Sequence, residues 1–247
     1  MLIVLPPSET KAAGGTGGPL QLDDLSFPEL NPTRRKLLDA LSTLADDVPE
    51  SLRVLKLTER QIDEVHRNTE LWDSPTTPAL RRYTGVLYDA LDIPSLSTAE
   101  QERAGERLAV ASALFGLLRG NDMIPAYRLS AGNSLPGVGS LRRVWRAALE
   151  PVLAEISGLV LDLRSSAYAA LAAIPGAVGL RVLSENELGQ RKVISHHNKA
   201  HKGKLARAVV QADAEPETVE DVIDLAHDAG LRVERESARQ LCLVVPA

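Results

Sequence analysis

The chain has 247 residues, a formal net charge of -5, a single cysteine and only 3% aromatic residues. This length fits one domain, and the negative charge argues against a protein whose whole surface binds nucleic acid. The scarcity of aromatic side chains also argues against a platform on which single-stranded bases stack. Because Cys242 has no second cysteine to pair with, an intrachain disulfide is excluded and a reducing compartment is expected.

The protein is expected to be cytoplasmic and to have no membrane partner. Its first residues, MLIVLPPSE, lack the basic segment of a signal peptide, and their apolar run is too short for one. No apolar run elsewhere reaches the ~18 residues that a membrane span needs. These bulk properties leave the oligomeric state open.

The first third of the chain predicts one buried strand followed by helices. Leu2–Leu5 is an all-apolar run typical of a buried strand. The polar residues Ser8–Lys11 follow directly, where α/β proteins commonly place ligands, although an ordinary turn is the alternative. The glycine-rich segment 14–18 matches neither GxGxxG nor a Walker A sequence, which favours a surface loop. Helices are predicted at 28–44 with Thr33 as N-cap, from Thr58 with a capping box, and at 79–91.

The rest of the chain interleaves strands and helices. A nearly all-apolar run predicts a central strand at 107–115, and the segment after it carries Arg119, Tyr127 and Arg128. Arginines beside a strand exit suit bidentate capture of phosphate or carboxylate, although surface salt bridges would also explain them. The later elements are a basic helix at 141–153, a strand at 159–163, a hairpin of strands at 181–185 and 192–196, a helix over the 195–210 stretch, a helix at 219–229, and strands at 231–236 and 240–245.

This order of elements predicts a mixed α/β (α+β) fold. The chain shows no internal repeat and no composition shift that would mark a domain boundary. We therefore expect a single compact domain with a central mixed β-sheet flanked by helices and a basic cleft at one sheet edge.

The range Ser195–Arg207, SHHNKAHKGKLAR, is a basic stretch in an acidic chain. At about 100° per residue, the apolar stripe of this helix continues back to Asn198, Lys199 and Lys202. Polar groups would therefore face the core, and an inward lysine needs a partner, a wet cavity or a chemical role. Gly203 is unfavourable inside a helix, which predicts either close approach of backbone or ligand, or a later helix start.

Four groups of basic residues could meet at one edge of the sheet. They are Lys11, Arg119 with Arg128, Arg164, and Lys199 with Lys202. If the loops that carry them converge, they enclose a cationic pocket with Glu9 and Asp162 as its acids. Such a pocket suits a phosphorylated, polyanionic or nucleic-acid ligand. A lysine whose pKa is lowered by cationic neighbours could also act there as a nucleophile or general base.

A metal site is the competing interpretation of the basic stretch. His197 and His201 stand four residues apart on the predicted helix, which is a workable spacing for metal ligands. The chain has no HExxH sequence, however, and the surroundings of the pair are cationic, so neither a metal nor a cofactor is expected. Direct iron sequestration by His196, His197 and His201 remains as the weaker reading.

Four motifs occur in order across almost the whole chain: PPSETK, LFGLLRGNDMIPAYRL, LDLRSSAYAAL and SHHNKAHKGKLAR. Together they resemble the YaaA family of bacterial peroxide stress proteins. The resemblance implies a single-domain mixed α/β fold with a positively charged cleft, a cytosolic location and a role in limiting iron-driven oxidative damage. It also implies DNA binding, partly through a helix-hairpin-helix element. The chain departs from the usual Gly-hydrophobic-Gly turn of that element, since no glycine occurs between Gly18 and Gly85.

The resemblance also implies which residues form the site. Those that would bind a ligand or nucleic acid are Ser8, Lys11, Arg119, Tyr127, Arg128, Arg164, Asn198 and Arg207. If the protein is an enzyme, the catalytic residues would be Lys199, Lys202, Asp162 and Tyr168. The first hypothesis is a peroxide stress protein whose cleft binds nucleic acid or another polyanion. The alternative is an enzyme that uses an inward lysine as base or nucleophile on a nucleotide, nucleoside or other phosphorylated metabolite.

Overall fold

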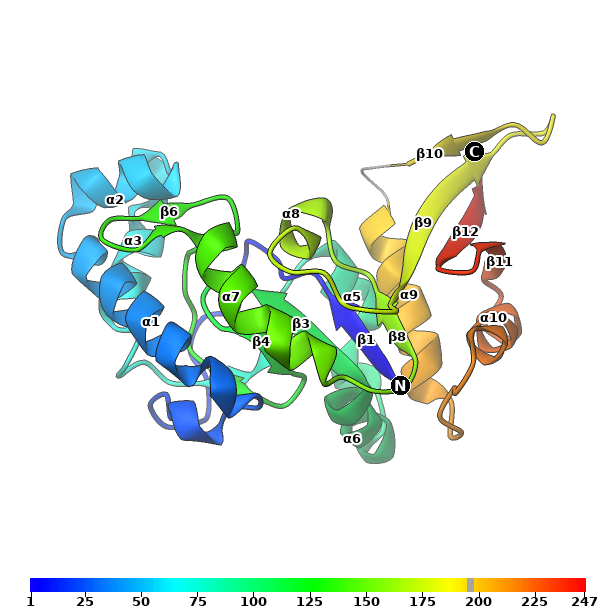
Figure 1. Ribbon diagram of the computed structural model, residues 1–247, viewed down its shortest axis with the longest axis horizontal. Coiled ribbons are helices and arrows are strands. Elements are labelled where there is room, and N and C mark those ends of the chain that lie inside the picture. Colours follow the sequence, from blue (N-terminus) through cyan, green and yellow to red (C-terminus); the bar gives the residue numbers. More distant parts are fainter. Residues whose placement is uncertain (195–197) are drawn as a thin grey trace.

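The computed structural model of the protein describes residues 1–194 and 198–247. Within these residues, an eight-stranded sheet runs in the order β11-β12-β9-β8-β1-β3-β4, and β10 also pairs with β9 (Figure 1). The strands are β1 (Leu2–Leu5), β3 (Leu108–Ser112), β4 (Gly116–Arg119), β8 (Val160–Asp162), β9 (Val178–Glu185), β10 (Arg191–Val193), β11 (Arg232–Ser237) and β12 (Gln240–Pro246). The pairs β1–β3, β1–β8, β8–β9 and β9–β12 are parallel, whereas β3–β4, β9–β10 and β11–β12 are antiparallel. The predicted mixed α/β fold is confirmed.

The central strand β1 is buried along its whole length because it pairs in parallel on both sides. Ile3 aligns with Leu108 of β3 and with Leu161 of β8. A strand covered on both faces is apolar throughout, which explains the unbroken run LIVL. Since β1, β3 and β8 run in one direction, their carboxyl ends lie at the same edge of the sheet. In open parallel sheets this is the edge at which ligands bind.

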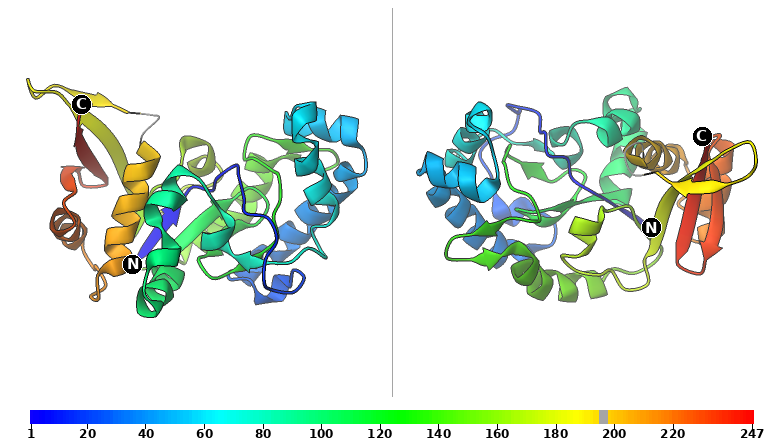
Figure 2. Two further views of the ribbon diagram at one scale, coloured as in Figure 1. Left: turned by 180° about the vertical axis from the view of Figure 1, so that it is seen from behind. Right: turned by 90° about the horizontal axis from the view of Figure 1, so that it is seen from above.

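Helices cover both faces of the sheet. Figures 1 and 2 show α7 across one face, and α5, α6 and α9 on the other. The helices are α1 (Asn31–Ala45), α2 (Val48–Leu55), α3 (Ile62–Thr69), α4 (Ala79–Arg82), α5 (Val86–Leu91), α6 (Thr98–Arg107), α7 (Leu141–Ala154), α8 (Ser166–Ala169), α9 (Asn198–Gln211) and α10 (Val219–Asp228). Short strands pair outside the main sheet: β2 (Thr77–Pro78) with β5 (Met123–Ile124), and β6 (Ser134–Leu135) with β7 (Gly139–Ser140). No helix in the described part of the chain has both the length and the apolar character needed to cross a bilayer.

The structure corrects three of the predicted boundaries. Thr33 is not an N-cap, because α1 has already begun before it. The helix predicted at 79–91 is divided into α4 and α5, because Gly85 has a φ of 95° and interrupts the helical backbone. Arg107 ends α6 instead of opening a strand. The sequence analysis missed α6, although Ser97 and Glu100 form the capping box that precedes it.

The helices α2 and α3 are joined by a tight turn that contains no glycine. Lys56 follows α2 with a φ of 57°, in the left-handed region that glycine adopts most easily. Thr58 then begins the capping box predicted from TERQ, with its backbone N–H donating to Gln61 Oε1 at 3.2 Å. The missing glycine therefore does not prevent a close helix pair here.

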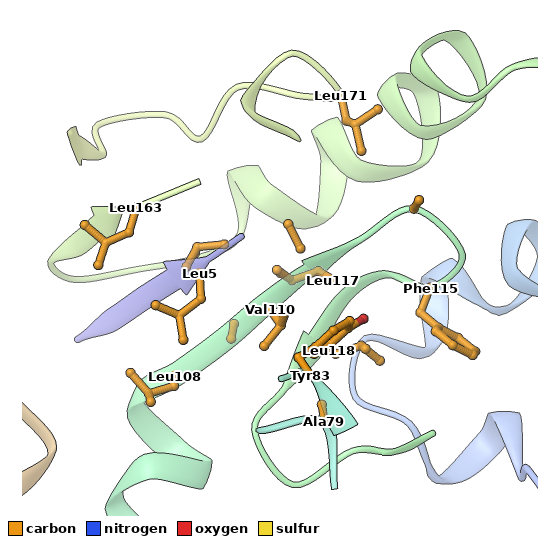
Figure 3. Packing of buried hydrophobic residues seen from close by; sticks show 14 of the residues in the cluster. Leu5, Ala79, Tyr83, Leu108, Val110, Phe115, Leu117, Leu118, Leu163 and Leu171 are labelled. Carbon is orange, nitrogen blue, oxygen red and sulfur yellow. The ribbon is translucent and has the colours of Figure 1, made fainter. Parts of the chain in front are cut away.

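The core between the sheet and its helices is built mainly from aliphatic side chains. Leu5, Leu108 and Val110 pack together from neighbouring strands, as Figure 3 shows. A glycine brings α7 close to the sheet, because Gly116 has a φ of 76° and a Cβ there would lie 2.5 Å from the ring of Trp145. One of the few aromatic side chains, Trp145, thus packs α7 against the sheet.

Arg34 in α1 is fully buried and donates to three backbone carbonyls and one side-chain amide oxygen. Its hydrogen bonds go to Phe115 O (3.0 Å), Leu117 O (2.8 Å), Ser26 O (2.8 Å) and Asn31 Oδ1 (2.8 Å). We expect Arg34→Met to lower the free energy of unfolding by ~3–5 kcal/mol, because it leaves several acceptors buried without a donor. Urea denaturation would measure this, with the exposed Arg142→Met as control. A loss below about 1 kcal/mol would contradict the expectation.

Candidate functional site

A cavity of about 460 Å³ lies at the carboxyl ends of β1 and β8. We call it the β1/β8 pocket. In Figure 1, α8 and the start of α9 lie on the side of the sheet toward which β1 points. The pocket is lined by Pro6, Pro7, Ser8, Glu9, Arg128, Leu129, Ser130, Ala131, Gly132, Arg164, Ser165, Ser166, Ala167, Tyr168, Asn198, Lys199 and Lys202. Segments of all four sequence motifs therefore meet in one place.

The loop after β8 brings Arg164 into the pocket wall in a fixed orientation. Its guanidinium makes two hydrogen bonds to Asp162, from Nε to Oδ1 at 2.9 Å and from Nη2 to Oδ2 at 2.8 Å. A further bond from Nη1 reaches Ala172 O at 3.0 Å. Arg164 is buried, and Asp162 does not line the pocket. Asp162 was predicted as a catalytic group, but both of its carboxylate oxygens accept hydrogen bonds from Arg164 and orient it.

The segment after β5 supplies Arg128, whose backbone is pinned by a buried asparagine from α3. Asn68 Nδ2 donates to Arg128 O at 2.9 Å, and Asn68 Oδ1 accepts from the Arg128 N–H at 2.8 Å. The Arg128 guanidinium contacts Glu9 Oε2 at 3.1 Å across the pocket wall. Sequence reasoning missed Asn68 because it considered only the helical pattern of IDEVHRN. The available signal was an amide in line with Val65 on the apolar face of that helix.

Lys11 lies behind the pocket and supports the loop that lines it. Its Nζ donates to Ser8 O at 3.2 Å and to Glu9 O at 3.3 Å, and it lies 4.2 Å from the ring centroid of Tyr127. Burial, followed by the nearby charge of Arg128, lowers the pKa of Lys11 to about 7. Lys11 was predicted to bind ligand, but its ammonium group contacts the backbone of the wall instead of lining the cavity.

The two predicted tyrosines occupy different positions. The Tyr127 hydroxyl is buried, 2.8 Å from the Tyr83 hydroxyl and 2.8 Å from Ser112 Oγ, so it belongs to the core behind Lys11. Tyr168 lines the β1/β8 pocket. Burial raises the pKa of both hydroxyls, so each keeps its proton at neutral pH. Of the two, Tyr168 can present a neutral donor to a ligand.

The helix α9 places Lys202 in the pocket floor. Lys202 is 9% exposed, and its Nζ donates to Leu163 O at 2.8 Å. Burial lowers the pKa of Lys202, while the charge of Asp162 acts in the opposite direction. Gly203 allows α9 to pack closely on α5, because a Cβ at this position would lie 2.2 Å from Leu87 O of α5. Gly203 is therefore a point of close backbone approach inside α9, which starts at Asn198.

Lys199 does not face the core as predicted. Its side chain is exposed, although it contributes to the pocket lining together with Asn198, which is half-buried. The reason is that the first turn of α9 forms part of the pocket wall, so a polar side chain there reaches solvent without entering the core. Only Lys202 of the two lysines is buried.

Two predicted ligand-binding residues lie elsewhere. Arg119 ends β4, which is antiparallel to β3, and this direction carries it to the opposite edge of the sheet. There it borders a separate cavity of about 610 Å³, together with Phe27 and α7 residues. Arg207 lies farther along α9 and donates to Leu91 O at 2.8 Å and Asp92 O at 2.9 Å, which ties α9 to the turn after α5. Neither side chain lines the β1/β8 pocket.

The alternative metal site was predicted from three histidines, and the described residues include only one of them, His201. His196 and His197 lie outside them, and His201 borders a different hollow near β12. Within the ranges 1–194 and 198–247, no group of three or more His, Cys, Asp or Glu residues is placed to hold a metal ion.

Comparison with known proteins supports the resemblance to the YaaA family. A family model described as peroxide stress protein YaaA matches residues 1–237. A UPF0246 protein of Corynebacterium efficiens is 45% identical, covering 99% of this chain and 100% of the relative. A UPF0246 protein of Streptomyces coelicolor is 45% identical over 96% of this chain and 93% of the relative. A more distant one from Aliivibrio fischeri is 29% identical over 96% and 95%. These three relatives carry the UPF0246 designation, and the chain belongs to the YaaA family of peroxide stress proteins.

Proposed function

We propose that this peroxide stress family member binds a phosphate-bearing ligand of nucleotide size in the β1/β8 pocket. The observation that carries the proposal is the set of charged side chains in the pocket lining. Arg128, Arg164, Lys199 and Lys202 contribute to it, whereas Glu9 is the only acid among the described residues of the lining. A phosphate group carries the charge and the acceptor oxygens that such donors recognise.

The partners of these residues leave cationic capacity for a ligand. Arg164 is oriented by its hydrogen bonds to Asp162 and to Ala172 O, so it is a fixed part of the pocket wall. Arg128 shares one contact with Glu9, and a guanidinium has five N–H donors. Lys199 forms none of the ion pairs found among the described residues. We infer that Arg128 and Lys199 receive the phosphate.

The size of the pocket favours a small molecule over a duplex. A volume of about 460 Å³ falls within the range of small-molecule sites, which is roughly 300–1,000 Å³. A duplex is bound by a row of basic residues along an extended surface. Nucleic-acid binding and a cleft that accepts it therefore stay predictions, and the small ligand is the function we put forward.

Isothermal titration calorimetry with the four 5′-nucleoside monophosphates and with adenosine would test the proposal. We expect at least one monophosphate, AMP among them, to bind with a dissociation constant below about 1 mM. Adenosine, which has no phosphate, should bind at least about tenfold more weakly, because a charge-assisted hydrogen bond contributes ~1.5–3 kcal/mol. Arg128→Leu and Lys199→Met should each weaken monophosphate binding by a similar factor.

Arg119→Leu is the matched control, since it removes a guanidinium at the opposite edge of the sheet. It should leave the affinity unchanged. The proposal is wrong if no monophosphate binds, or if Arg119→Leu weakens binding as much as Arg128→Leu. A 20-base-pair duplex titrated in parallel would show whether nucleic acid competes for the same site.

A further inference from the structure

The β1/β8 pocket contains one amine in a setting unlike that of a surface lysine. Lys202 lines the pocket, and among the described residues its Nζ donates one hydrogen bond, to Leu163 O at 2.8 Å. Among the described residues, no carboxylate lies within ion-pair distance of it. Asp162, whose charge raises the pKa of Lys202, has both oxygens bound by Arg164. The amine is therefore buried without a described carboxylate in contact with it.

The position of this amine is fixed by the fold. At Gly203 the backbone of α9 packs so closely on α5 that an added Cβ would lie 2.2 Å from Leu87 O. Arg107 Nη1 donates to Val209 O at 2.8 Å and to Ala212 O at 2.7 Å at the far end of the helix. A nucleophile held rigidly beside a bound ligand reacts as part of the complex, which raises its effective concentration.

The remaining groups in the lining suit addition to a carbonyl. Burial lowers the pKa of Lys202, which favours the neutral, nucleophilic amine. Tyr168 keeps its proton and can donate to a carbonyl oxygen. Arg128 and Lys199 can hold an anionic group of the same ligand. A phosphate-bearing molecule with an aldehyde or ketone would engage all three.

We propose that Lys202 forms an imine with the carbonyl carbon of a phosphorylated aldehyde or ketone in the β1/β8 pocket. This inference rests on the proposed function, because the phosphate places the carbonyl. The nitrogen lone pair attacks the carbonyl carbon, and the π electron pair moves to the carbonyl oxygen. Protonation of that oxygen gives a hydroxyl group. Loss of water, which takes that oxygen and the two amine protons, gives the C=N bond without an oxidant or a reductant.

Reductive trapping tests the proposal directly. The protein is incubated with dihydroxyacetone phosphate and sodium cyanoborohydride, whose hydride reduces the imine to a stable secondary amine. Peptide mass spectrometry should locate the adduct on Lys202, at least about tenfold above the adduct on the exposed Lys204 of the same helix. Dihydroxyacetone, which lacks the phosphate, should label Lys202 no more than Lys204.

Two controls separate a specific site from general lysine reactivity. The variant Lys202→Arg should lose the adduct, whereas Lys204→Arg, which lies outside the pocket lining, should retain the adduct on Lys202. Excess AMP added to the wild-type protein should suppress labelling of Lys202 and leave labelling of Lys204 unchanged, which requires no variant to fold. Equal labelling of the two lysines, or labelling of Lys202 that AMP does not suppress, would overturn the proposal. AMP binding without any adduct would overturn the imine alone, whereas absence of nucleotide binding would overturn the proposed function.

Discussion

Substituting Lys11 with methionine is expected to remove a steep rise of stability with pH. The folded pKa of Lys11 is about 7, against 10.5 for an exposed lysine. Between these values the unfolded chain binds a proton that the folded protein does not. The free energy of unfolding of the wild type should therefore rise with pH by about 1.4 kcal/mol per unit from this residue. Below pH 7 both states are protonated, and the contribution should be flat.

Urea denaturation of the wild type and Lys11→Met at several values between pH 6 and pH 9 would measure the effect. The difference in unfolding free energy between the two proteins should change by ~2.3 kcal/mol from pH 7 to pH 9 and by less than ~0.5 kcal/mol from pH 6 to pH 7. Lys36→Met, which removes an exposed lysine from α1, is the control and should follow the wild type throughout. Parallel curves for the wild type and Lys11→Met would show that Lys11 stays protonated in the fold.

Gly203→Ala is expected to destabilise the protein by ~2–3 kcal/mol or more, even though alanine favours a helix interior. The added Cβ would lie 2.2 Å from Leu87 O and 2.9 Å from Ala90 Cβ of α5. The oxygen belongs to the backbone, so one of the two helices must move. Thermal and urea denaturation would measure the loss. Because α9 carries Lys202, nucleotide binding should weaken in the same variant.

The matched control is Gly105→Ala, in the interior of α6. There the added Cβ would meet the side chain of Asn121, which is exposed and can turn away. This substitution should be neutral or stabilising by up to ~1 kcal/mol. Equal effects of the two substitutions would contradict the close packing of α9 on α5.

The sequence predicted most strands of the central sheet, although β4 was not among them. All-apolar runs such as LIVL predict buried parallel strands because both faces of the strand are covered. The loops after β1 and β8 then had to emerge at one edge, and this places Ser8 and Arg164 in one pocket. Parallel strand direction is what made this part of the site predictable.

Arg119 shows why the same reasoning failed elsewhere. It follows an apolar run just as Arg164 does, yet its own strand β4 turns back along β3 after Gly116. The sequence does not state whether two neighbouring apolar segments pair in parallel or in antiparallel fashion. That choice decides at which edge of the sheet the residue emerges.

Burial of single polar residues was also beyond the sequence pattern. Lys11 lies in the polar run SETK and was expected in the ligand site, but Tyr83 and Tyr127 from distant segments enclose it. Asn68 lies on a helix that looked solvated, although it fixes the backbone of Arg128. Such contacts depend on tertiary packing, which overrides local pattern.

Hydrogen exchange of the protein with and without AMP would locate the ligand site. On AMP binding we expect slower exchange in four segments that line the β1/β8 pocket, 6–9, 128–132, 164–168 and 198–202. Exchange should be unchanged at 27–29 and 147–157, which border the larger cavity at the opposite edge. Protection of that second set, without protection of the first, would contradict the assignment of the β1/β8 pocket as the ligand site.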